Sequence, residues 1–272
     1  MSLFNAMRNI AIFLCVAMIA SACSHDPTKD YKERSVSEIY NEAMGYLQQK
    51  QYRYAASSFD EVERQHPYSE WARKGELMAA YSYYMANKYD DAVLAAERFI
   101  TLHPGSKDAA YAYYLTAICY YEQISDVGRD QKMTEQALTA LQDVVRRFPD
   151  SVYAKDARLK IDLTQDHLAG KEMNIGRFYE KQGQYLAAAQ RFKTVVEKYQ
   201  TTSHAPEALE RLVECDLALG LTTDAEQVAA VLGYNYPTSD WYRYAYNLLE
   251  KKRVTSVDRP QSWLSRMWTS VF

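Results

Sequence analysis

One pattern of small and large apolar residues returns five times along this chain, and it restricts the possible folds more than any other feature. In the first copy, Ala55 is followed one and two helical turns later by Phe59 and Val62, and Pro67 closes the segment. The alanines of the five copies are Ala55, Ala92, Ala137, Ala188 and Ala225. A pattern that recurs at such a period is the signature of a repeat protein, in which each unit buries its apolar face against the next.

The copies have the spacing of amphipathic α-helices, and no stretch alternates polar and apolar residues as a half-buried strand does. Glycine and proline, at 9 and 7 of 272 residues, are scarce enough to permit long helices. Four prolines follow the amphipathic stretches, where a helix has to end: Pro67, Pro104, Pro149 and Pro237. The chain is therefore predicted to be all-α.

The small and aromatic positions resemble the second helix of the tetratricopeptide repeat (TPR). An alanine at this place lets two helices approach closely, and the larger residue one turn later fills the adjoining space. The resemblance implies helix pairs that stack side by side, with the last apolar face covered by a further element. Residues 240–252 have the composition for that role. The predicted fold is a superhelical solenoid of about five TPR repeats plus a C-terminal capping helix.

The sequence spacings between the recurring alanines predict which repeats contain insertions. The spacing is the same from Ala55 to Ala92 as from Ala188 to Ala225, but it is longer in between. We place one insertion at 125–132, between the two helices of repeat 3. A second insertion lengthens the first helix of repeat 4 over 152–181, where Gly170 is predicted to mark a kink or break.

Residues 1–22 are predicted to be a secretory signal rather than part of the fold. Arg8 precedes an apolar run at 10–19, and small residues then precede Cys23, which is the order of a cleaved signal peptide. The run is about half of the ~20 residues that a membrane-spanning helix needs. An ordinary signal peptidase could cut before Cys23, but the sequence Ala-Ser-Ala-Cys at 20–23 also resembles the bacterial lipobox. That resemblance implies lipid attachment at Cys23.

The chain divides into five predicted segments. They are 1–22, a lipoprotein signal peptide; 23–35, lipid anchor and tether; 36–150, TPR repeats 1–3 with a peptide groove; 151–252, TPR repeats 4–5 and the cap, for scaffold docking; and 253–272, a C-terminal tail. The tail carries Trp263 and Trp268 at helix-compatible spacing, so it could lie at a membrane interface, pack on a partner or stay disordered. The net charge of −3 gives no basic face for nucleic acid.

The residue inventory argues against an enzyme. The chain has no glycine-rich phosphate loop, no His-Glu-x-x-His motif and no Cys-x-x-Cys pair, and its five histidines are dispersed. Cys119 and Cys215 fall in the first helices of repeats 3 and 5, too far apart along a solenoid for the ~7 Å between Cα atoms that a disulfide allows. We predict no metal site, no disulfide and no cofactor other than the covalent lipid on Cys23.

The first helices of such repeats line a concave channel, and this chain places apolar and phenolic side chains there in repeats 1–3. The predicted peptide-binding groove consists of Tyr40, Met44, Leu47, Leu77, Tyr81, Tyr84, Tyr111, Tyr114 and Tyr121. Tyrosine buries a large area at low entropic cost and keeps a polar tip, so this lining favours an extended peptide that carries aromatic residues. The alternative is that these tyrosines only pack between neighbouring helices.

The C-terminal half has charged residues at the corresponding positions. Glu207, Glu210 and Glu214 form one stripe on a helix, and Arg177 stands in the preceding repeat. Such a stripe is either a solvated face or a docking surface for a basic partner. The resulting hypothesis is that repeats 1–3 capture a peptide while repeats 4–5 attach to a scaffold.

Over residues 35–252 the chain resembles the BamD family, the TPR lipoproteins of the outer-membrane β-barrel assembly machinery. The segments that carry the resemblance are Tyr40-Asn41-Glu42-Ala43, His66-Pro67-Tyr68-Ser69 and Tyr120-Tyr121-Glu122-Gln123-Ile124 followed by Arg129-Asp130-Gln131. The resemblance implies a lipid-anchored protein of the outer membrane that faces the periplasm. It implies capture of targeting strands of unfolded outer-membrane proteins. It also implies docking on the periplasmic domains of the central barrel subunit through Arg191, beside other assembly lipoproteins.

Three alternatives remain at this point. A pilotin-type TPR lipoprotein for secretin or pilus assembly would bind a secretin instead of a barrel-assembly subunit. A soluble periplasmic TPR scaffold would require Cys23 to remain without lipid. A peptidoglycan-cleaving enzyme is the alternative from a different functional class.

Overall fold

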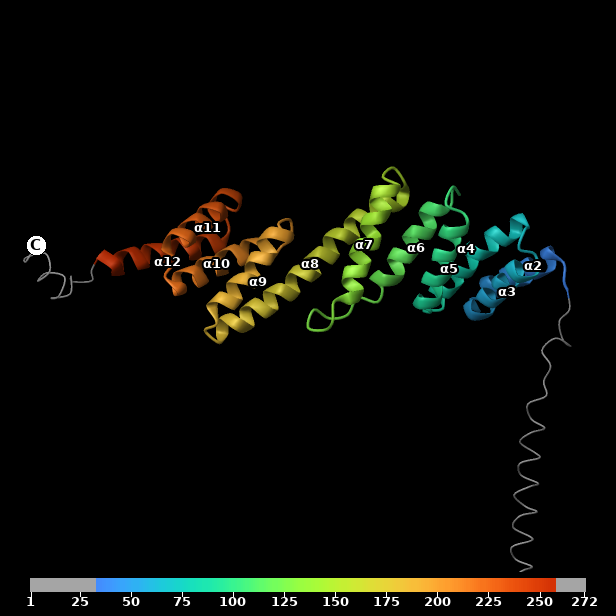
Figure 1. Ribbon diagram of the computed structural model, residues 1–272, viewed down its shortest axis with the longest axis horizontal. Coiled ribbons are helices and arrows are strands. Elements are labelled where there is room, and N and C mark those ends of the chain that lie inside the picture. Colours follow the sequence, from blue (N-terminus) through green and yellow to red (C-terminus); the bar gives the residue numbers. More distant parts are fainter. Residues whose placement is uncertain (1–32, 258–272) are drawn as a thin grey trace, which may run out of the picture.

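A computed structural model of the chain describes residues 33–257, which form a row of helices with no strand among them (Figure 1). The helices are α2 (Val36–Gln48), α3 (Tyr52–Gln65), α4 (Glu70–Met85), α5 (Tyr89–Leu102), α6 (Ala109–Tyr121), α7 (Lys132–Arg147), α8 (Val152–Lys181), α9 (Tyr185–Lys198), α10 (Ala205–Leu219), α11 (Thr222–Asn235) and α12 (Asp240–Val257). Each of the helices α2–α11 packs on its neighbours in sequence, and α12 lies on α10 and α11. The predicted all-α solenoid with five helix pairs and a cap is confirmed.

The recurring alanines form the contacts between helices, as the repeat register predicts. Ala55, Ala92, Ala137, Ala188 and Ala225 are all fully buried. The large residues that follow them, among them Phe59, Phe99 and Phe192, are buried as well. Each such side chain contributes about 1.5–3 kcal/mol by leaving water. The core of the described residues is thus a series of small clusters, each formed between consecutive helices, instead of one central core.

One glycine of this core is required by the close approach of a ring. Gly176 in α8 faces Phe192 in α9, and a Cβ built on Gly176 would lie 2.8 Å from Cδ1 and Cζ of that ring. Real Cβ contacts are not that short, so only glycine fits here without a shift of the helix pair.

Three serines begin the first helices of repeats 1, 2 and 4. Ser35, Ser69 and Ser151 have extended backbones, and each side chain accepts a hydrogen bond from the backbone N–H three residues later. Such N-caps satisfy a helix donor that would otherwise lack an acceptor, and each is worth about 1 kcal/mol. The caps at Ser35 and Ser69 fix where α2 and α4, which carry predicted groove residues, begin.

Both predicted insertions are present, but Gly170 does not break the helix. The loop between α6 and α7 includes 125–131, and the ammonium of Lys171 in α8 donates to the carbonyls of Gly128 and Arg129, at 3.0 and 3.2 Å. Helix α8 is continuous over 30 residues. A Cβ on Gly170 would lie 3.2 Å from Nε2 of His204, so this glycine makes room for a neighbouring side chain.

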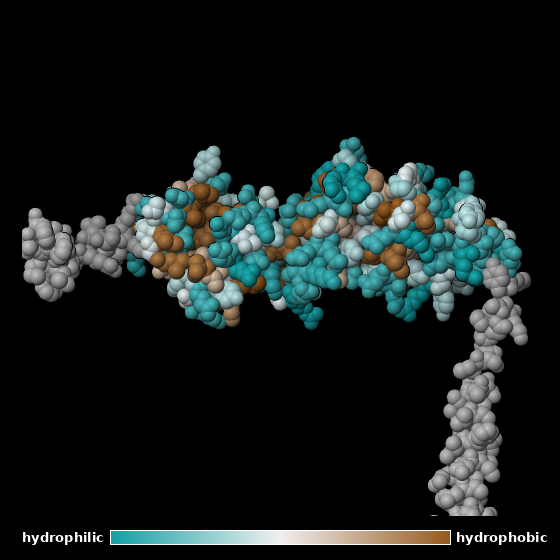
Figure 2. Space-filling view, viewed as in Figure 1, coloured by the Kyte–Doolittle hydropathy of each residue, from teal (hydrophilic) through white to brown (hydrophobic). Residues whose placement is uncertain are grey.

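The predicted cap at 240–252 is part of α12, which continues to Val257. Within residues 33–257, no helix is long and apolar enough to cross a membrane. The predicted signal peptide, Cys23 and the tail beyond Val257 lie outside the described residues. Figure 2 shows a mostly hydrophilic face on which apolar side chains gather in two areas, one over α4–α6 and one over α10–α12.

Candidate functional site

The predicted groove residues of repeats 1–3 are neither core nor freely exposed. All nine are half-buried: Tyr40, Met44 and Leu47 on α2, Leu77, Tyr81 and Tyr84 on α4, and Tyr111, Tyr114 and Tyr121 on α6. Four of the tyrosine rings, those of Tyr40, Tyr84, Tyr111 and Tyr114, also contact neighbouring aromatic rings. The shortest of these contacts joins Tyr40 and Trp71, at 4.7 Å between ring centroids. Each tyrosine therefore packs with the body of its ring and keeps part of it accessible. The packing interpretation holds for the buried part, and peptide binding by the accessible part stays a prediction.

Helix α8 contacts the predicted groove residues of α6 and forms an aromatic wall beside them, which the repeat register does not predict. The ring of Tyr153 stacks on Tyr114 at 5.2 Å and lies 5.5 Å from Tyr111. The Tyr114 hydroxyl donates to Asp156 at 2.5 Å, and the ammonium of Lys160 lies 2.9 Å from the same carboxylate. Burial alone would raise the pKa of Asp156, but these two hydrogen bonds hold it below its usual value. The charged Asp156 thus fixes the orientation of a groove tyrosine.

Two exposed leucines extend this wall along α8. Leu159 and Leu163 are 66% and 60% exposed, one turn apart. Leu163 also borders a cavity of about 290 Å³, together with Tyr121, Ile124 and His167. The signal in the sequence was the apolar spacing of Val152, Leu159 and Leu163, which marks one face of a helix. The repeat register does not predict this face, because the TPR positions of repeat 4 fall in the C-terminal half of the long helix.

The charged residues of repeats 4 and 5 meet at a junction between α8 and α10. Arg177 holds Glu207 through two hydrogen bonds, at 2.9 and 2.6 Å. A second arginine that sequence reasoning missed, Arg211, lies among four carboxylates. Its nitrogens are 2.7 Å from Glu214, 3.6 Å from Glu180, 3.6 Å from Glu207 and 3.8 Å from Glu210. We call this cluster the Arg211 junction.

The stripe Glu207, Glu210 and Glu214 is not the solvated face considered from the sequence. The side chain of Glu210 is 4% exposed and that of Glu207 is 13% exposed, whereas that of Glu214 is 31% exposed. The stripe turns toward α8, where Arg177 pairs with Glu207, because an ion pair across the two helices offsets the cost of burying the carboxylates. Among the three proposed docking glutamates, Glu210 has to be corrected, since it is buried and borders only a hollow between α10 and α12.

The junction holds more acid than its arginines neutralise. Burial, and then repulsion by Glu214, raises the pKa of Glu210 to about 7. Burial and an interaction with Glu214 likewise raise the pKa of Glu180 to about 7. For Glu207 burial acts in the same direction, but Arg177 outweighs it and lowers the pKa. Two carboxyl groups of this cluster therefore titrate near neutral pH.

Glu210→Gln is expected to stabilise the protein at pH 8 and to do little at pH 5. The pKa of Glu210 rises on folding from 4.5 to about 7, so its contribution is fully present below pH 4.5 and is lost as pH rises through 7. Glutamine cannot ionise, and a gain of about 1 kcal/mol corresponds to about 2–4 °C in Tm for a chain of this size. Calorimetry at both pH values measures the difference. The control is Glu197→Gln on α9, where the carboxylate is exposed; equal shifts of the Glu210→Gln protein at both pH values would contradict the prediction.

Arg191, the docking arginine that the family resemblance implies, is on α9 beside Phe192. Its guanidinium lies 3.2 Å from Glu172 of α8, and its side chain is 42% exposed. The ion pair holds the guanidinium against α8 while leaving it accessible. Such a partly exposed pair contributes little to stability, so Arg191 is available for an intermolecular contact.

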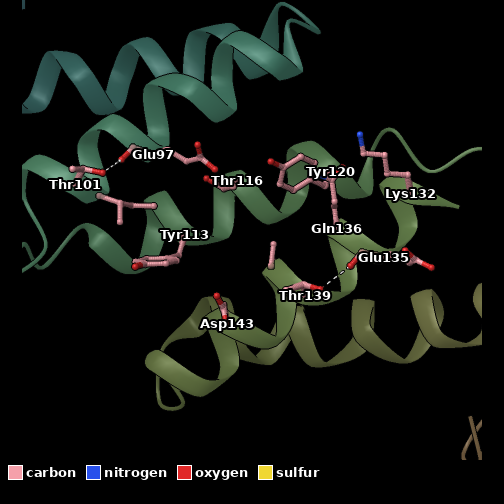
Figure 3. Close-up of a pocket in the computed structure, with 12 residues that line it drawn as sticks. Glu97, Thr101, Tyr113, Thr116, Tyr120, Lys132, Glu135, Gln136, Thr139 and Asp143 are labelled. Atoms are coloured by element: carbon pink, nitrogen blue, oxygen red, sulfur yellow. Dashed lines mark hydrogen bonds between the residues drawn. The ribbon is translucent and has the colours of Figure 1, made fainter. Parts of the chain in front are cut away.

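A cavity of about 650 Å³ lies between α5, α6 and α7, and it contains none of the predicted site residues (Figure 3). Acidic side chains line it, among them Glu97, Glu135 and Asp143. Its threonine hydroxyls are satisfied within their own helices, since Thr101 and Thr139 donate to carbonyl groups one turn earlier. This arrangement brings no nucleophile together with an activating base.

The cysteines and histidines outside these clusters are the other candidates for reactive or metal-binding groups. Cys119 and Cys215 are free, buried thiols, as their positions along the solenoid predict, and burial raises the pKa of each to about 12. Among the residues whose side chains are described, no group of three or more His, Cys, Asp or Glu could hold a metal ion. The Nε2 atom of His103 lies 3.1 Å from Glu76, which is buried.

Comparison with known proteins identifies a family. Residues 32–232 match the family described as "Outer membrane lipoprotein". A protein of Caulobacter vibrioides is 54% identical over 92% of this chain and 83% of its own length. One of Rickettsia prowazekii is 45% identical over 89% of this chain and 96% of its own length. Both are named "Outer membrane protein assembly factor BamD".

Solved structures of repeat proteins show weaker similarity. A TPR protein of Thermus thermophilus covers 79% of this chain and all of its own, with 19% identity and a TM-score of 0.37. The TPR domain of P58(IPK) covers 79% of this chain and 56% of its own, with 13% identity and a TM-score of 0.42.

Proposed function

The chain belongs to the BamD family of outer membrane protein assembly factors, and on that basis we propose that it joins two partners within the assembly machinery. Its role is in outer-membrane protein assembly, as a scaffold and not as an enzyme. In our proposal, repeats 1–3 bind the targeting strands of unfolded outer-membrane proteins. Repeats 4–5 dock on the periplasmic domains of the central barrel subunit, beside the other assembly lipoproteins.

The observation that carries this proposal is the row of half-buried tyrosines on α2, α4 and α6, continued by α8. Rings held by their neighbours lose little entropy when a peptide covers them. The Tyr114 hydroxyl is engaged by Asp156, and the hydroxyls of the other groove tyrosines can bond to the peptide backbone. Exposed Leu159 and Leu163 add apolar area along the same wall. A surface of this kind suits an extended strand that carries aromatic side chains.

The charged side chains of repeats 4–5 support the proposed docking role. Arg191 and Glu214 are partly exposed, while Arg177 and Glu207 hold each other across α8 and α10. A partner with complementary charges would gain specificity and association rate from such a surface. A lipid on Cys23 would keep the protein at the outer membrane, facing the periplasm; the order of residues 8–23 supports that anchor.

Arg191→Glu is expected to reduce co-purification of the central barrel subunit at least fivefold. The change reverses one charge at the proposed contact and places it beside Glu172. The tagged protein is purified from its own membranes in mild detergent, and mass spectrometry quantifies its partners. The control is Lys193→Glu, which reverses the same charge on the same helix at a side chain that is 59% exposed.

Two results would overturn the proposal. Recovery of a secretin with the unmodified protein would support the pilotin-type alternative. Equal recovery of the barrel subunit with Arg191→Glu and Lys193→Glu would remove Arg191 from the contact.

A further inference from the structure

Two hollows flank the Arg211 junction and share a wall. One, of about 450 Å³, is bordered by Arg177, Glu180 and Tyr185, and the other, of about 390 Å³, by Glu210, Trp241 and Tyr244. Arg211 and Glu214 border both. The residues that border the second hollow belong to α10 and α12. These helices are drawn from orange to red in Figure 1.

At the wall of the second hollow, a buried carboxylate lacks a donor. Glu210 is 3% exposed, and its Oε2 atom accepts no hydrogen bond. The guanidinium Nε of Arg211, 3.8 Å away, makes no hydrogen bond either. A buried polar group without a partner costs about 1–3 kcal/mol, and more when it is charged. The geometry therefore leaves an unpaired acceptor in the wall of the hollow, and a donor that enters the hollow has to displace part of that wall to reach it.

The charges around the hollow are also unbalanced. Arg177 is engaged by both carboxylate oxygens of Glu207, which leaves Arg211 to face Glu180, Glu210 and Glu214. The lysines that border the two hollows, Lys181 and Lys251, have exposed side chains. The pKa values of Glu180 and Glu210, both raised to about 7, agree with this shortage of positive charge within the junction.

We propose that the hollow between α10 and α12 receives an arginine side chain from a partner protein docked on repeats 4–5. This inference rests on the proposed docking role of these repeats. Glu214 at the mouth and Glu210 inside would accept from the two edges of the guanidinium, whose planar fork suits carboxylates. Trp241 and Tyr244 also border the hollow, and the guanidinium of Arg243 already lies 5.8 Å from the Tyr244 ring, so such groups stack on these aromatic residues. Arg211 already has its guanidinium carbon 6.0 Å from the Trp241 ring.

A direct binding experiment tests the hollow itself. The full protein, purified in mild detergent, is titrated by calorimetry with acetyl-triarginine amide and with the uncharged analogue built from citrulline. We expect the arginine peptide to bind, and Glu210→Gln and Glu214→Gln each to weaken it at least fivefold. The matched control, Glu197→Gln, removes an exposed carboxylate on α9 and should change affinity less than twofold. Equal binding of both peptides, or unchanged affinity in both junction variants, would overturn the proposal.

A competing occupant is the chain itself, because Arg259 and Arg266 follow α12 in the sequence. A chain that ends at Val257 should bind the peptide as the full chain does. A gain of fivefold or more on truncation would assign the hollow to residues 258–272 and overturn the partner proposal. Co-purification distinguishes failure of this inference from failure of the proposed docking role. If the unmodified protein recovers the barrel subunit and Glu214→Gln and Glu210→Gln recover as much, this inference fails while the docking role stands. If the unmodified protein recovers no membrane partner, the docking role fails.

Discussion

Replacing Gly176 with alanine should lower the Tm of this protein by about 4–12 °C. The added methyl group would overlap the ring of Phe192, which is itself fully buried between α8 and α9. Overpacking of a close-packed core costs about 2–3 kcal/mol, and each kcal/mol corresponds to about 2–4 °C in a chain of this size. Thermal unfolding followed by circular dichroism measures the effect.

Gly45 provides the matched control, because it also lies within a helix but a Cβ there would meet nothing within 4 Å. Gly45→Ala should raise the Tm slightly, since alanine is the better helix former by about 1 kcal/mol. Phe192→Leu, added to Gly176→Ala, should recover part of the loss by shortening the opposing side chain. If both glycine variants shifted the Tm in the same direction, the close packing of α8 on α9 would not be the cause.

The double change Tyr81→Ala, Tyr84→Ala should weaken binding of a targeting-strand peptide about 100-fold. Truncation of an aromatic residue at the centre of an interface costs about 1.5 kcal/mol or more, and two such losses amount to about two factors of ten. The measurement is fluorescence anisotropy with a labelled peptide that ends in an aromatic residue.

The controls for this change are Tyr68→Ala and Tyr234→Ala, which remove tyrosines that are almost fully exposed. They should leave peptide affinity within twofold. The proposed division of roles would collapse if the double change impaired recovery of the barrel subunit while peptide affinity stayed intact.

The repeat register could be predicted from the sequence because close packing of helices leaves few residue types possible at the contact. Ala137 and Ala188 had to be small, and the large residues behind them had to be apolar, whatever the rest of the chain did. Insertions between such fixed points are read directly from the spacing. The long first helix of repeat 4 was predicted in this way.

Glycines and charges could not be interpreted from one helix at a time. A glycine such as Gly170 predicts a helix break, yet α8 is continuous at this position. The glycine leaves space for His204 from another repeat. Glu210 has the position of a surface residue, yet it is buried because Arg211 and the glutamates of the junction face α8. In both cases a deciding neighbour is remote in the sequence, His204 for Gly170 and Glu180 of α8 for Glu210, and a local pattern contains no information about it.

The 30-residue helix α8 has a mechanical consequence. At 1.5 Å per residue it is a rod about 45 Å long. Near one end it carries Asp156 and Lys160 of the tyrosine groove, and near the other Arg177 and Glu180 of the Arg211 junction. A tilt of about 5° at the first end displaces the second by about 4 Å, because no hinge interrupts the lever. The tyrosine groove and the Arg211 junction are therefore attached to one continuous helix, and a tilt of α8 at either of them displaces the other.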